Sequence, residues 1–346
     1  MGCKLDVGLV AEHDVVEGSE PASNLNLSET FLTNGGRITP DRAGNAQMGS
    51  NFERLVRHHA EMKFGTKDRI AVAKWVGYWT DTLSRNLGLM SGFRARNQIN
   101  FRDKTVLDVG CGTGGLSKIV TAEGGRYIGC DLFPAALEMA AAFISDLPEK
   151  EECSLLRSSG TSIPLADRSV DIIVAFDVIE HVEGGWDWQL SFLREIRRVL
   201  RCKGIVLLTT PNRLYPYEGH TFLLGPQYLP VWLADQYIRW RNPSFLQEHG
   251  TYGEIKLLNP WQLRRLLRQA DLELVHDFPF ETDLENLGLR RVLLMKILTR
   301  LGLGWFPTSS FWFTACRRED WDKLRPLRIM VGRPSRFPGL QRRLTR

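Results

Sequence analysis

The segment Thr105–Gly115, TVLDVGCGTGG, decides the fold of this chain. Its first five residues form a short apolar run, which is typical of a strand buried on both faces. Closely spaced glycines follow, and a helix is expected from there to about Ala122. Glycine lets a ligand approach the backbone, and a helix start offers free N–H groups with a partial positive charge. The segment therefore predicts a ligand-binding turn in an α/β fold.

Strand and helix patterns alternate outward from this turn. We expect strands at 105–110, 126–131, 153–159, 171–178 and 204–210, with helices at 134–144 and 188–200 between them. Continuous apolar strands that alternate with helices indicate a parallel sheet covered on both faces. After about fifty residues the pattern resumes with a helix at 259–270, capped by Asn259, and strands at 272–278 and 310–318.

The rest of the chain divides by composition. Residues 1–50 are polar and lack periodicity, so we expect a disordered extension. Residues 51–100 are expected to form a helical segment, with two helices between 52 and 89. The main domain is predicted over 101–318, interrupted by insertions at 213–258 and 281–308 that form a lid. Residues 319–346 form a basic tail, which either meets phosphate groups or is a solvated end.

Bulk properties exclude several classes of protein. The chain has 346 residues, 43% hydrophobic content and a net charge of +5. Its six cysteines form no CxxC pair, which argues against a zinc site or a disulfide framework and favours a reducing, cytoplasmic location. No run of 18 apolar residues is present, so no membrane-spanning helix is predicted.

Two carboxylates indicate which ligand the glycine-rich turn binds. Asp108 stands two residues before the first glycine, where it would repel a pyrophosphate and suit a cationic amino group. Asp131 ends the second strand, where an acidic residue accepts bonds from ribose hydroxyls. A ligand with a ribose, a cation and no pyrophosphate is S-adenosylmethionine. The spacing Gly110-x-Gly112-x-x-Gly115 also satisfies the dinucleotide fingerprint, so an NAD-dependent oxidoreductase is an alternative.

Four segments together resemble a known family: VLDVGCGTGG, GCD, IPLADRSVDIIVAFDVIEHV and REIRRVLRCKGIVLLTTPN. They look like successive motifs of the class I S-adenosylmethionine-dependent methyltransferases, most of all the ubiquinone- and menaquinone-biosynthesis branch. The resemblance is strong over 104–212 and weak over 259–318. It implies a Rossmann-like, seven-stranded, mostly parallel sheet whose last two strands form an antiparallel hairpin at the edge.

The resemblance also implies a set of cofactor contacts. Asp108 would bind the amino group, Asp131 the ribose, and Leu132 would flank the adenine. One departure is Ser159, followed by Gly160, where the family often has an aspartate that accepts from the adenine amino group. The remaining expected contacts surround the methionine part and the sulfonium: Gly110, Cys111, Gly112, Gly114 and Phe176.

The end of the fourth strand, AFDVIEHV, carries the candidate catalytic residues Asp177, Glu180 and His181. His181 has a near-neutral reference pKa and can act as a general base. The resemblance to quinone-pathway O-methyltransferases implies instead that the three residues hold a divalent cation such as Mg²⁺. A third interpretation is that they only shape the turn. His220 and Tyr217 are further candidates for a base or a pocket wall.

The two insertions indicate what kind of molecule accepts the methyl group. Residues 229–240 are rich in aromatics, and 286–306 mix Leu, Ile and Met with arginine and lysine. Such segments suit an apolar ligand or a membrane surface, although they can also be lids packed on the core. We therefore expect O-methylation of a bulky, partly apolar small molecule: a quinone precursor, polyketide or glycolipid. C-methylation and a non-catalytic partner subunit are alternatives, and FDVIEH at the fourth strand argues against methylation of nucleic-acid bases.

Overall fold

The computed structural model describes residues 49–97, 99–279 and 309–322. The predicted extension at 1–48, the insertion at 281–308 and the tail after 322 lie outside these residues. The first residues of the expected tail belong to the domain, because the Asp320 carboxylate accepts from Lys203 N at 2.8 Å and Trp321 Nε1 donates to Leu274 O at 3.2 Å.

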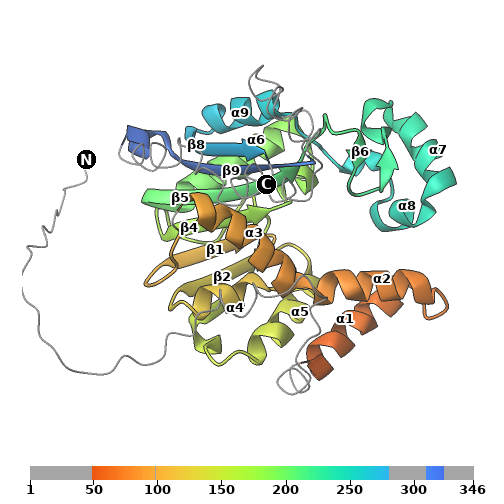
Figure 1. Cartoon of the computed structure of the whole chain (residues 1–346), viewed down its shortest axis with the longest axis horizontal. Coiled ribbons are helices and arrows are strands. Elements are labelled where there is room, and N and C mark those ends of the chain that lie inside the picture. Colours follow the sequence, from red (N-terminus) through yellow and green to blue (C-terminus); the bar gives the residue numbers. More distant parts are fainter. Residues whose placement is uncertain (1–48, 98, 280–308, 323–346) are drawn as a thin grey trace, which may run out of the picture. The chain divides into compact units, whose positions relative to one another are not determined.

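A seven-stranded sheet forms the centre, in the order β3-β2-β1-β4-β5-β9-β8 (Figure 1). The first five strands are parallel, whereas β9 runs antiparallel to both β5 and β8. This confirms the predicted sheet and its antiparallel edge hairpin. The strands are β1 (Thr105–Val109), β2 (Arg126–Asp131), β3 (Cys153–Arg157), β4 (Val170–Phe176), β5 (Leu200–Pro211), β8 (Leu272–Pro279) and β9 (Ser310–Arg317).

The strand order reverses between β1 and β4. The chain runs outward from β1 to β3 and then crosses to β4, which pairs with the other side of β1. In open α/β sheets, ligands bind outside the carboxyl ends of the strands at such a switch point. The fold therefore places the glycine turn after β1 and the AFDVIEHV segment after β4 at the same end of neighbouring strands.

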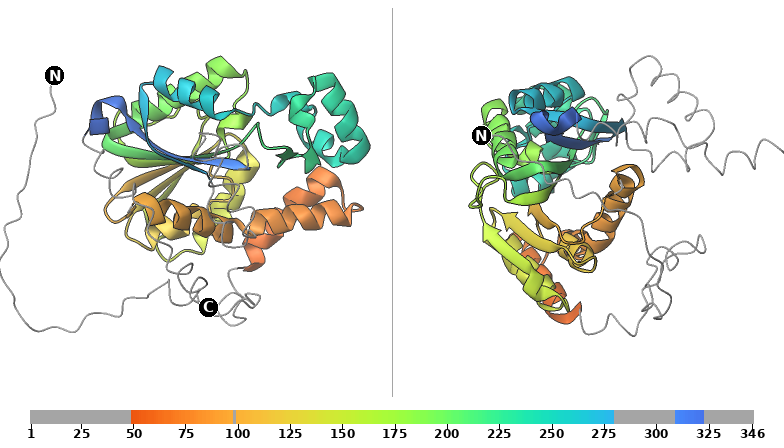
Figure 2. Two further views of the ribbon diagram at one scale, coloured as in Figure 1. Left: turned by 45° about the horizontal axis from the view of Figure 1, so that its top comes forward. Right: turned by 90° about the vertical axis from the view of Figure 1, so that its left-hand side faces the viewer.

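Helices cover both faces of the sheet, as Figure 2 shows. Alternate residues of one strand serve opposite cores: Val106 packs with α1 to α5, while Leu107 packs with α6 and α9. The first layer consists of α1 (Gly49–Phe64), α2 (Arg69–Thr80), α3 (Thr82–Asn97), α4 (Leu116–Thr121) and α5 (Pro134–Ser145). The second consists of α6 (Trp186–Val199) and α9 (Pro260–Gln269), whose predicted cap at Asn259 forms a capping box with Gln262.

In the described residues, three helices precede the sheet, where the periodicity predicted two. Asp68 begins α2 by accepting a bond from Ala71 N at 3.0 Å. At the other end of α2 the Thr80 hydroxyl donates back to Val76 O at 2.7 Å, and α3 starts two residues later. A break of one residue hardly disturbs a helical pattern of apolar side chains, so the sequence pattern does not reveal it.

The insertion at 213–258 has a small core of its own. It contains the hairpin β6 (Tyr217–Glu218) and β7 (Leu223–Leu224) and the helices α7 (Val231–Arg241) and α8 (Pro243–His249). The aromatic-rich segment 229–240 lies largely in α7, which begins just after Pro230. Ala234, Ile238 and Phe245 are buried together inside it. The insertion is tied back to the domain by Lys256 N, which donates to Glu180 O at 2.7 Å.

Within the described ranges, no helix combines the length and the apolar character that crossing a membrane requires.

Candidate functional site

The turn after β1 has a backbone that only glycine adopts readily. Gly110, Gly112 and Gly114 have φ angles of 68°, 53° and 73°, in the left-handed region. Side chains would also collide there: a Cβ on Gly110 would lie 2.6 Å from Val178, and one on Gly112 would lie 2.8 Å from Trp79. Gly115 is different, because it is right-handed and forms the N-cap of α4. The three strained positions are those expected beside the methionine part of the cofactor.

The two predicted carboxylates both lie at this turn. Asp131 holds the turn in shape, since its Oδ2 accepts from Gly112 N and its Oδ1 from Phe133 N, each at 3.0 Å. Each oxygen keeps a further lone pair for a ribose hydroxyl. Asp108 is buried, and its Oδ2 accepts from the Tyr127 hydroxyl at 2.9 Å. Burial raises the pKa of Asp108 to about 7, and a cationic ligand would reverse that shift.

The expected adenine side is built from short polar side chains. The Ser159 and Thr161 hydroxyls lie 3.1 Å apart, and the Ser158 hydroxyl donates to backbone carbonyls of the same turn. Gly160 is needed for packing, because a Cβ there would lie 2.5 Å from Phe192. Leu132 is exposed, as a residue that flanks a ligand would be in the free protein. Cys111 is buried, and burial raises the pKa of its thiol well above the usual value.

The N-terminal helices cover the glycine turn, which the sequence did not indicate. The Trp79 indole lies against Gly112, and the Thr113 hydroxyl donates to Trp79 O at 3.3 Å. In the next helix, Phe93 of α3 stacks on Phe176 at the end of β4, with ring centroids 5.6 Å apart. The aromatic residues of 51–100 gave a helical period, but a period does not say which strand end the helix covers.

Asp177 turns toward β5. It has a φ of 54°, and its Oδ1 accepts from the Thr209 hydroxyl at 2.9 Å while its N–H donates to Thr209 O at 3.0 Å. Desolvation raises its pKa. The residue as a whole is nonetheless exposed.

Glu180 is completely buried in the short turn after Asp177. Its Oε2 accepts from the Thr210 hydroxyl at 2.9 Å. Its Oε1 is also buried and has no hydrogen-bond partner in the described part of the chain. Desolvation and the nearby charge of Asp177 raise the pKa of Glu180 to about 8. Burial therefore favours the neutral, protonated form of the Glu180 side chain.

His220 reaches this turn from the insertion. Its Nδ1 lies 2.7 Å from Glu218 Oε1, and Glu218 also accepts from the backbone N–H groups of His220 and Thr221. These bonds lower the pKa of Glu218 against the opposing effect of its burial, so it is an acceptor and His220 Nδ1 donates. The His220 and His181 rings meet edge to face, with centroids 5.1 Å apart. Glu180, His181 and His220 each offer one ligand atom, and these three atoms lie within 4.8 Å of one another.

The structure changes the expected catalytic trio. Glu180 and His181 lie together, but the third member of their cluster is His220, because Asp177 is engaged by Thr209. Desolvation and the neighbouring His220 and His249 lower the pKa of His181 to about 3, although the side chain is exposed, and its role as a general base stays a prediction. Tyr217 is exposed on the β6–β7 hairpin and lies outside the cluster.

The cluster does not suit the Mg²⁺ ion that the resemblance implies. Mg²⁺ takes oxygen ligands in near-octahedral geometry, whereas two of these three ligands are imidazoles. We therefore derive no step through Mg²⁺.

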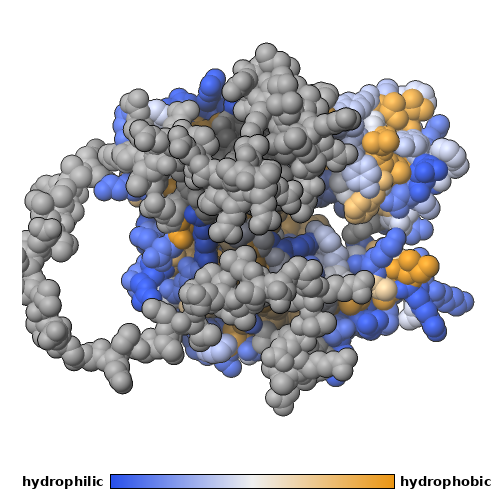
Figure 3. Space-filling model, viewed as in Figure 1, coloured by the Kyte–Doolittle hydropathy of each residue, from blue (hydrophilic) through white to orange (hydrophobic). Residues whose placement is uncertain are grey.

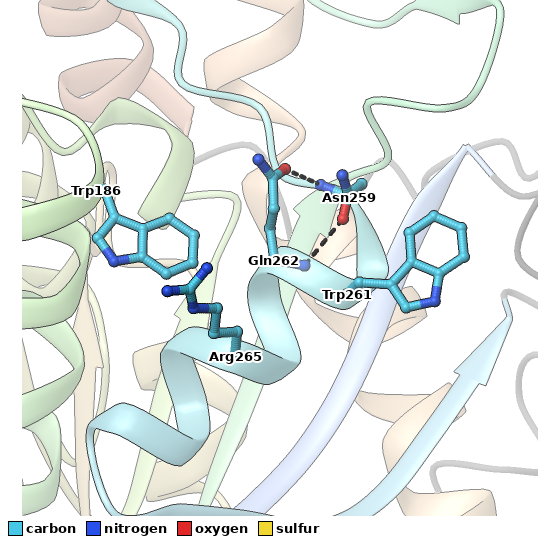
Figure 4. A pocket seen from close by; sticks show the side chains of 5 residues that line it. All are labelled: Trp186, Asn259, Trp261, Gln262 and Arg265. Atoms are coloured by element: carbon cyan, nitrogen blue, oxygen red, sulfur yellow. Dashed lines mark hydrogen bonds between the residues drawn. The ribbon is translucent and has the colours of Figure 1, made fainter.

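A separate hollow lies between the starts of α6 and α9 (Figure 4). Its walls are Trp186, Trp261 and Arg265, with the Arg265 guanidinium 5.3 Å from the Trp186 ring centroid. The amides of Asn259 and Gln262 also line it, but both are engaged in the capping box. The hollow thus offers little polar chemistry, and the glycine turn with the cluster after β4 is the stronger candidate site.

Fold and site together define a Rossmann-like α/β protein with a glycine turn suited to S-adenosylmethionine. Residues 107–208 match the family model described as Methyltransferase domain. An uncharacterized methyltransferase of Mycobacterium sp. (strain KMS) is 31% identical over 202 residues, which cover 58% of this chain and 74% of that protein. The chain belongs to the class I S-adenosylmethionine-dependent methyltransferases.

Two further comparisons describe the range of similarity. A probable S-adenosylmethionine-dependent methyltransferase of Mycobacterium tuberculosis (strain ATCC 25618 / H37Rv) is 33% identical over 133 residues, 38% of this chain and 45% of that protein. A putative methyltransferase solved in complex with the Haloferax volcanii Trm112 activator is 18% identical, with a TM-score of 0.46 over 69% of this chain and 93% of that one. The chain spans about half the length of the first curated relatives that it matches. Membership of the quinone-biosynthesis branch stays a prediction.

Proposed function

We propose that this protein transfers the methyl group of S-adenosylmethionine to a hydroxyl of a bulky, partly apolar small molecule. The observation that carries the proposal is the position of the Glu180, His181 and His220 cluster beside the cofactor turn. The Val178 side chain packs on Gly110 of the cofactor turn. The residues of the cluster that follow Val178 in the chain are therefore close to this turn. Proton-accepting groups are thus available next to the site expected for the sulfonium.

The demands of methyl transfer fit what these residues offer. When bound, S-adenosylmethionine supplies a methyl group on a positively charged sulfur, which already is a good leaving group. The protein must then hold the acceptor oxygen in line and remove its proton. Asp177 and His181 are exposed just after β4, and the Asp177 carboxylate can receive that proton.

The insertion supports an apolar, lipid-like acceptor and contact with a membrane surface. Phe222, Leu224, Trp232 and Trp240 expose 68%, 65%, 65% and 77% of their surface. Hydrophobic side chains gather over this part of the molecule in the space-filling view (Figure 3). Exposed apolar side chains in such number are characteristic of binding surfaces. Five free cysteines in the described residues are compatible with the proposed cytoplasmic location.

The experiment is methyl transfer with S-adenosylmethionine that carries ¹³C in its methyl group. Phenolic quinone precursors, polyketides and glycolipids serve as acceptors, and NMR of the product distinguishes an O-methyl from a C-methyl carbon. We expect an O-methyl signal. A C-methyl signal would replace the proposal by the C-methyltransferase alternative.

Calorimetry tests the cofactor independently of the acceptor. We expect S-adenosylhomocysteine to bind and NAD not to bind, with Asp131→Ala weakening the binding. Affinity for NAD alone would favour the oxidoreductase alternative. Binding of S-adenosylhomocysteine without turnover of any acceptor would favour a non-catalytic partner subunit.

A further inference from the structure

Tyr127 of β2 lies entirely inside the protein, and its phenolic hydroxyl is bonded to a residue of the cofactor site. The side chain has no exposed surface, and its hydroxyl donates to Asp108 Oδ2 at 2.9 Å. A buried phenolic hydroxyl needs a hydrogen-bond partner, and here the partner is the side chain expected to bind the amino group of the cofactor. Tyr127 is therefore a candidate for a residue that acts on the cofactor through Asp108.

The register of β1 and β2 explains how the hydroxyl reaches Asp108. Asp108 stands opposite Gly129, and Tyr127 lies two residues before Gly129 in the same strand. Side chains two residues apart in a strand point to the same face, so the Tyr127 ring extends along β2 over the glycine. A Cβ on Gly129 would lie 2.8 Å from the Tyr127 hydroxyl oxygen and 3.0 Å from Cε1 of its ring. The hydroxyl thus has room beside Asp108 because residue 129 has no side chain.

The surroundings of the two groups fix the direction of this hydrogen bond. Burial and the nearby charge of Asp108 raise the pKa of the Tyr127 phenol well above its usual value, so the phenol keeps its proton and donates. An ionised carboxylate can only accept. Oδ2 is thus held by Tyr127, whereas Oδ1 receives no hydrogen bond from the described residues. One oxygen of Asp108 is fixed by the protein, and the other is left for a ligand.

The bond from Tyr127 also favours the charged form of Asp108. Burial raises the pKa of Asp108, the Tyr127 hydroxyl lowers it, and the charge of Asp131 raises it further, to about 7. The other titratable groups that interact with Asp108 are the thiols of Cys111 and Cys130, which keep their protons because burial raises their pKa. Of these neighbours, Tyr127 is the one that stabilises the ionised carboxylate, since a donated hydrogen bond favours the charged acceptor.

We propose that Tyr127 is a positioning residue for the amino group of the cofactor: its hydroxyl holds one oxygen of Asp108 and leaves the other for that amino group. Gly129 has a part in this, because it makes room for the hydroxyl. The carboxylate is then already oriented when the ligand arrives, which strengthens its charge-assisted bond to an ammonium group. The inference rests on the proposed cofactor, but it does not depend on the methyl acceptor.

Calorimetry over a range of pH tests the proposal with two probes. S-adenosylhomocysteine carries the amino group, whereas 5′-methylthioadenosine has the same adenine, ribose and thioether but neither an amino nor a carboxyl group. Tyr127→Phe should move the midpoint of the rise in S-adenosylhomocysteine affinity upward by about one pH unit, because the lost bond favoured the ionised carboxylate. The variant should then bind about fivefold more weakly than wild type at pH 7, but less than about twofold more weakly at pH 8.5. Its affinity for 5′-methylthioadenosine should not change.

A second variant disturbs the same contact without removing the hydroxyl. Gly129→Ala places a Cβ against the Tyr127 hydroxyl and displaces it from Asp108, so we expect the same upward shift of the midpoint. Added to Tyr127→Phe, this change should move the midpoint no further, since the bond is already absent. Tyr252→Phe in the insertion is the matched control, because the Tyr252 hydroxyl is buried without a partner among the described residues. Its loss should leave the pH profile unchanged.

Circular dichroism shows which variants are folded, and Gly129→Ala decides the test if Tyr127→Phe does not fold. A wild-type pH profile in the folded variant would overturn the proposal. So would an equal loss of affinity at pH 7 and pH 8.5, or an equal loss for both probes, because either result would mean a merely structural role. In all these cases the wild-type protein still binds S-adenosylhomocysteine, and the proposed function stands. Absence of that binding in the wild type at every pH would instead remove the proposed cofactor together with the inference.

Discussion

The two halves of the site are built in opposite ways. The cofactor half, around Gly110 and Asp131, comes from β1, β2 and the turns that follow them, and both oxygens of Asp131 are bonded to backbone N–H groups. The acceptor half joins the turn after β4 to the insertion and leaves the buried Oε1 of Glu180 without a partner among the described residues. The polar groups of the first half are thus paired within the protein, whereas the second half keeps a buried oxygen without a partner among the described residues.

The largest expected effect tests the cofactor half. Gly110→Ala places a side chain at a φ of 68° and 2.6 Å from Val178, so we expect S-adenosylhomocysteine affinity to fall by 100-fold or more in calorimetry. Gly124→Ala is the matched control, because its φ is 79° but no atom lies within 4 Å of the new Cβ. It should cost about 1 kcal/mol of unfolding free energy and leave affinity intact. Equal affinity loss in both variants would mean that backbone strain, not the close fit at Gly110, controls binding.

Next in size is the pH dependence of cofactor binding. Burial raises the pKa of Asp108 to about 7, so its carboxyl is partly protonated near neutral pH and cannot fully pair with the amino group of the ligand. Affinity for S-adenosylhomocysteine should therefore rise with pH, by about fivefold from pH 6 to pH 7, and level off above pH 8. Asp108→Asn should bind weakly with no such rise. A pH-independent affinity in the wild type would contradict the role of Asp108.

The same pKa has a consequence for stability. Because the pKa of Asp108 is higher in the folded than in the unfolded chain, the folded state binds more protons between pH 4 and 7. The contribution of Asp108 to the unfolding free energy of the cofactor-free protein thus decreases as pH rises through that window and is lost above about pH 7. Denaturant unfolding of wild type and Asp108→Asn at pH 5 and pH 8 measures the difference, which should vanish when the ligand is saturating.

A smaller effect, on stability, is expected from a substitution in the acceptor half of the site. Thr210→Val removes the hydroxyl that donates to Glu180 and should lower the unfolding free energy by about 1–3 kcal/mol. Thr314→Val in β9 is the matched control, because the Thr314 hydroxyl is buried without a partner among the described residues, and its loss should be neutral or stabilising. Neither change should alter affinity for S-adenosylhomocysteine.

The smallest effect concerns the surface of the insertion. Trp240→Ala removes an indole that is 77% exposed, so the fold and cofactor affinity should be unchanged. Sedimentation with vesicles of anionic phospholipid should show weaker binding by a fewfold, since interfacial tryptophans anchor proteins at lipid headgroups. His58→Gln, on the exposed side of α1, serves as a surface control. Unchanged sedimentation of Trp240→Ala would remove the proposed membrane contact of this face.

Much of the fold followed from local patterns. Apolar runs such as TVLDV predicted each parallel strand, because a strand covered on both faces needs apolar residues throughout. The observed bounds differ by a few residues; β5, for instance, begins at Leu200 rather than at 204. The glycine turn and the two aspartates could also be predicted from the sequence, because these residues directly follow or end predicted strands.

The residues of the acceptor half were harder to predict from the sequence, for a physical reason. Nothing in the spacing of His220 and Glu218 ties them to Glu180, because the insertion could fold back in many ways. Trp79 is a similar case: its place in a helix was clear, but its contact with Gly112 depends on how α2 packs. The pKa of His181, about 3 in place of a near-neutral value, is likewise set by burial and by the rings of His220 and His249.

The sequence by itself thus determined the sheet, the cofactor turn and the family, because these depend on short-range patterns of apolar residues, glycines and carboxylates. Only the tertiary structure decided which side chains lie together in the acceptor half of the site. Long-range packing brought His220 against Glu180 and turned Asp177 toward Thr209. It thereby exchanged an oxygen-rich set of possible ligands for one with two imidazoles.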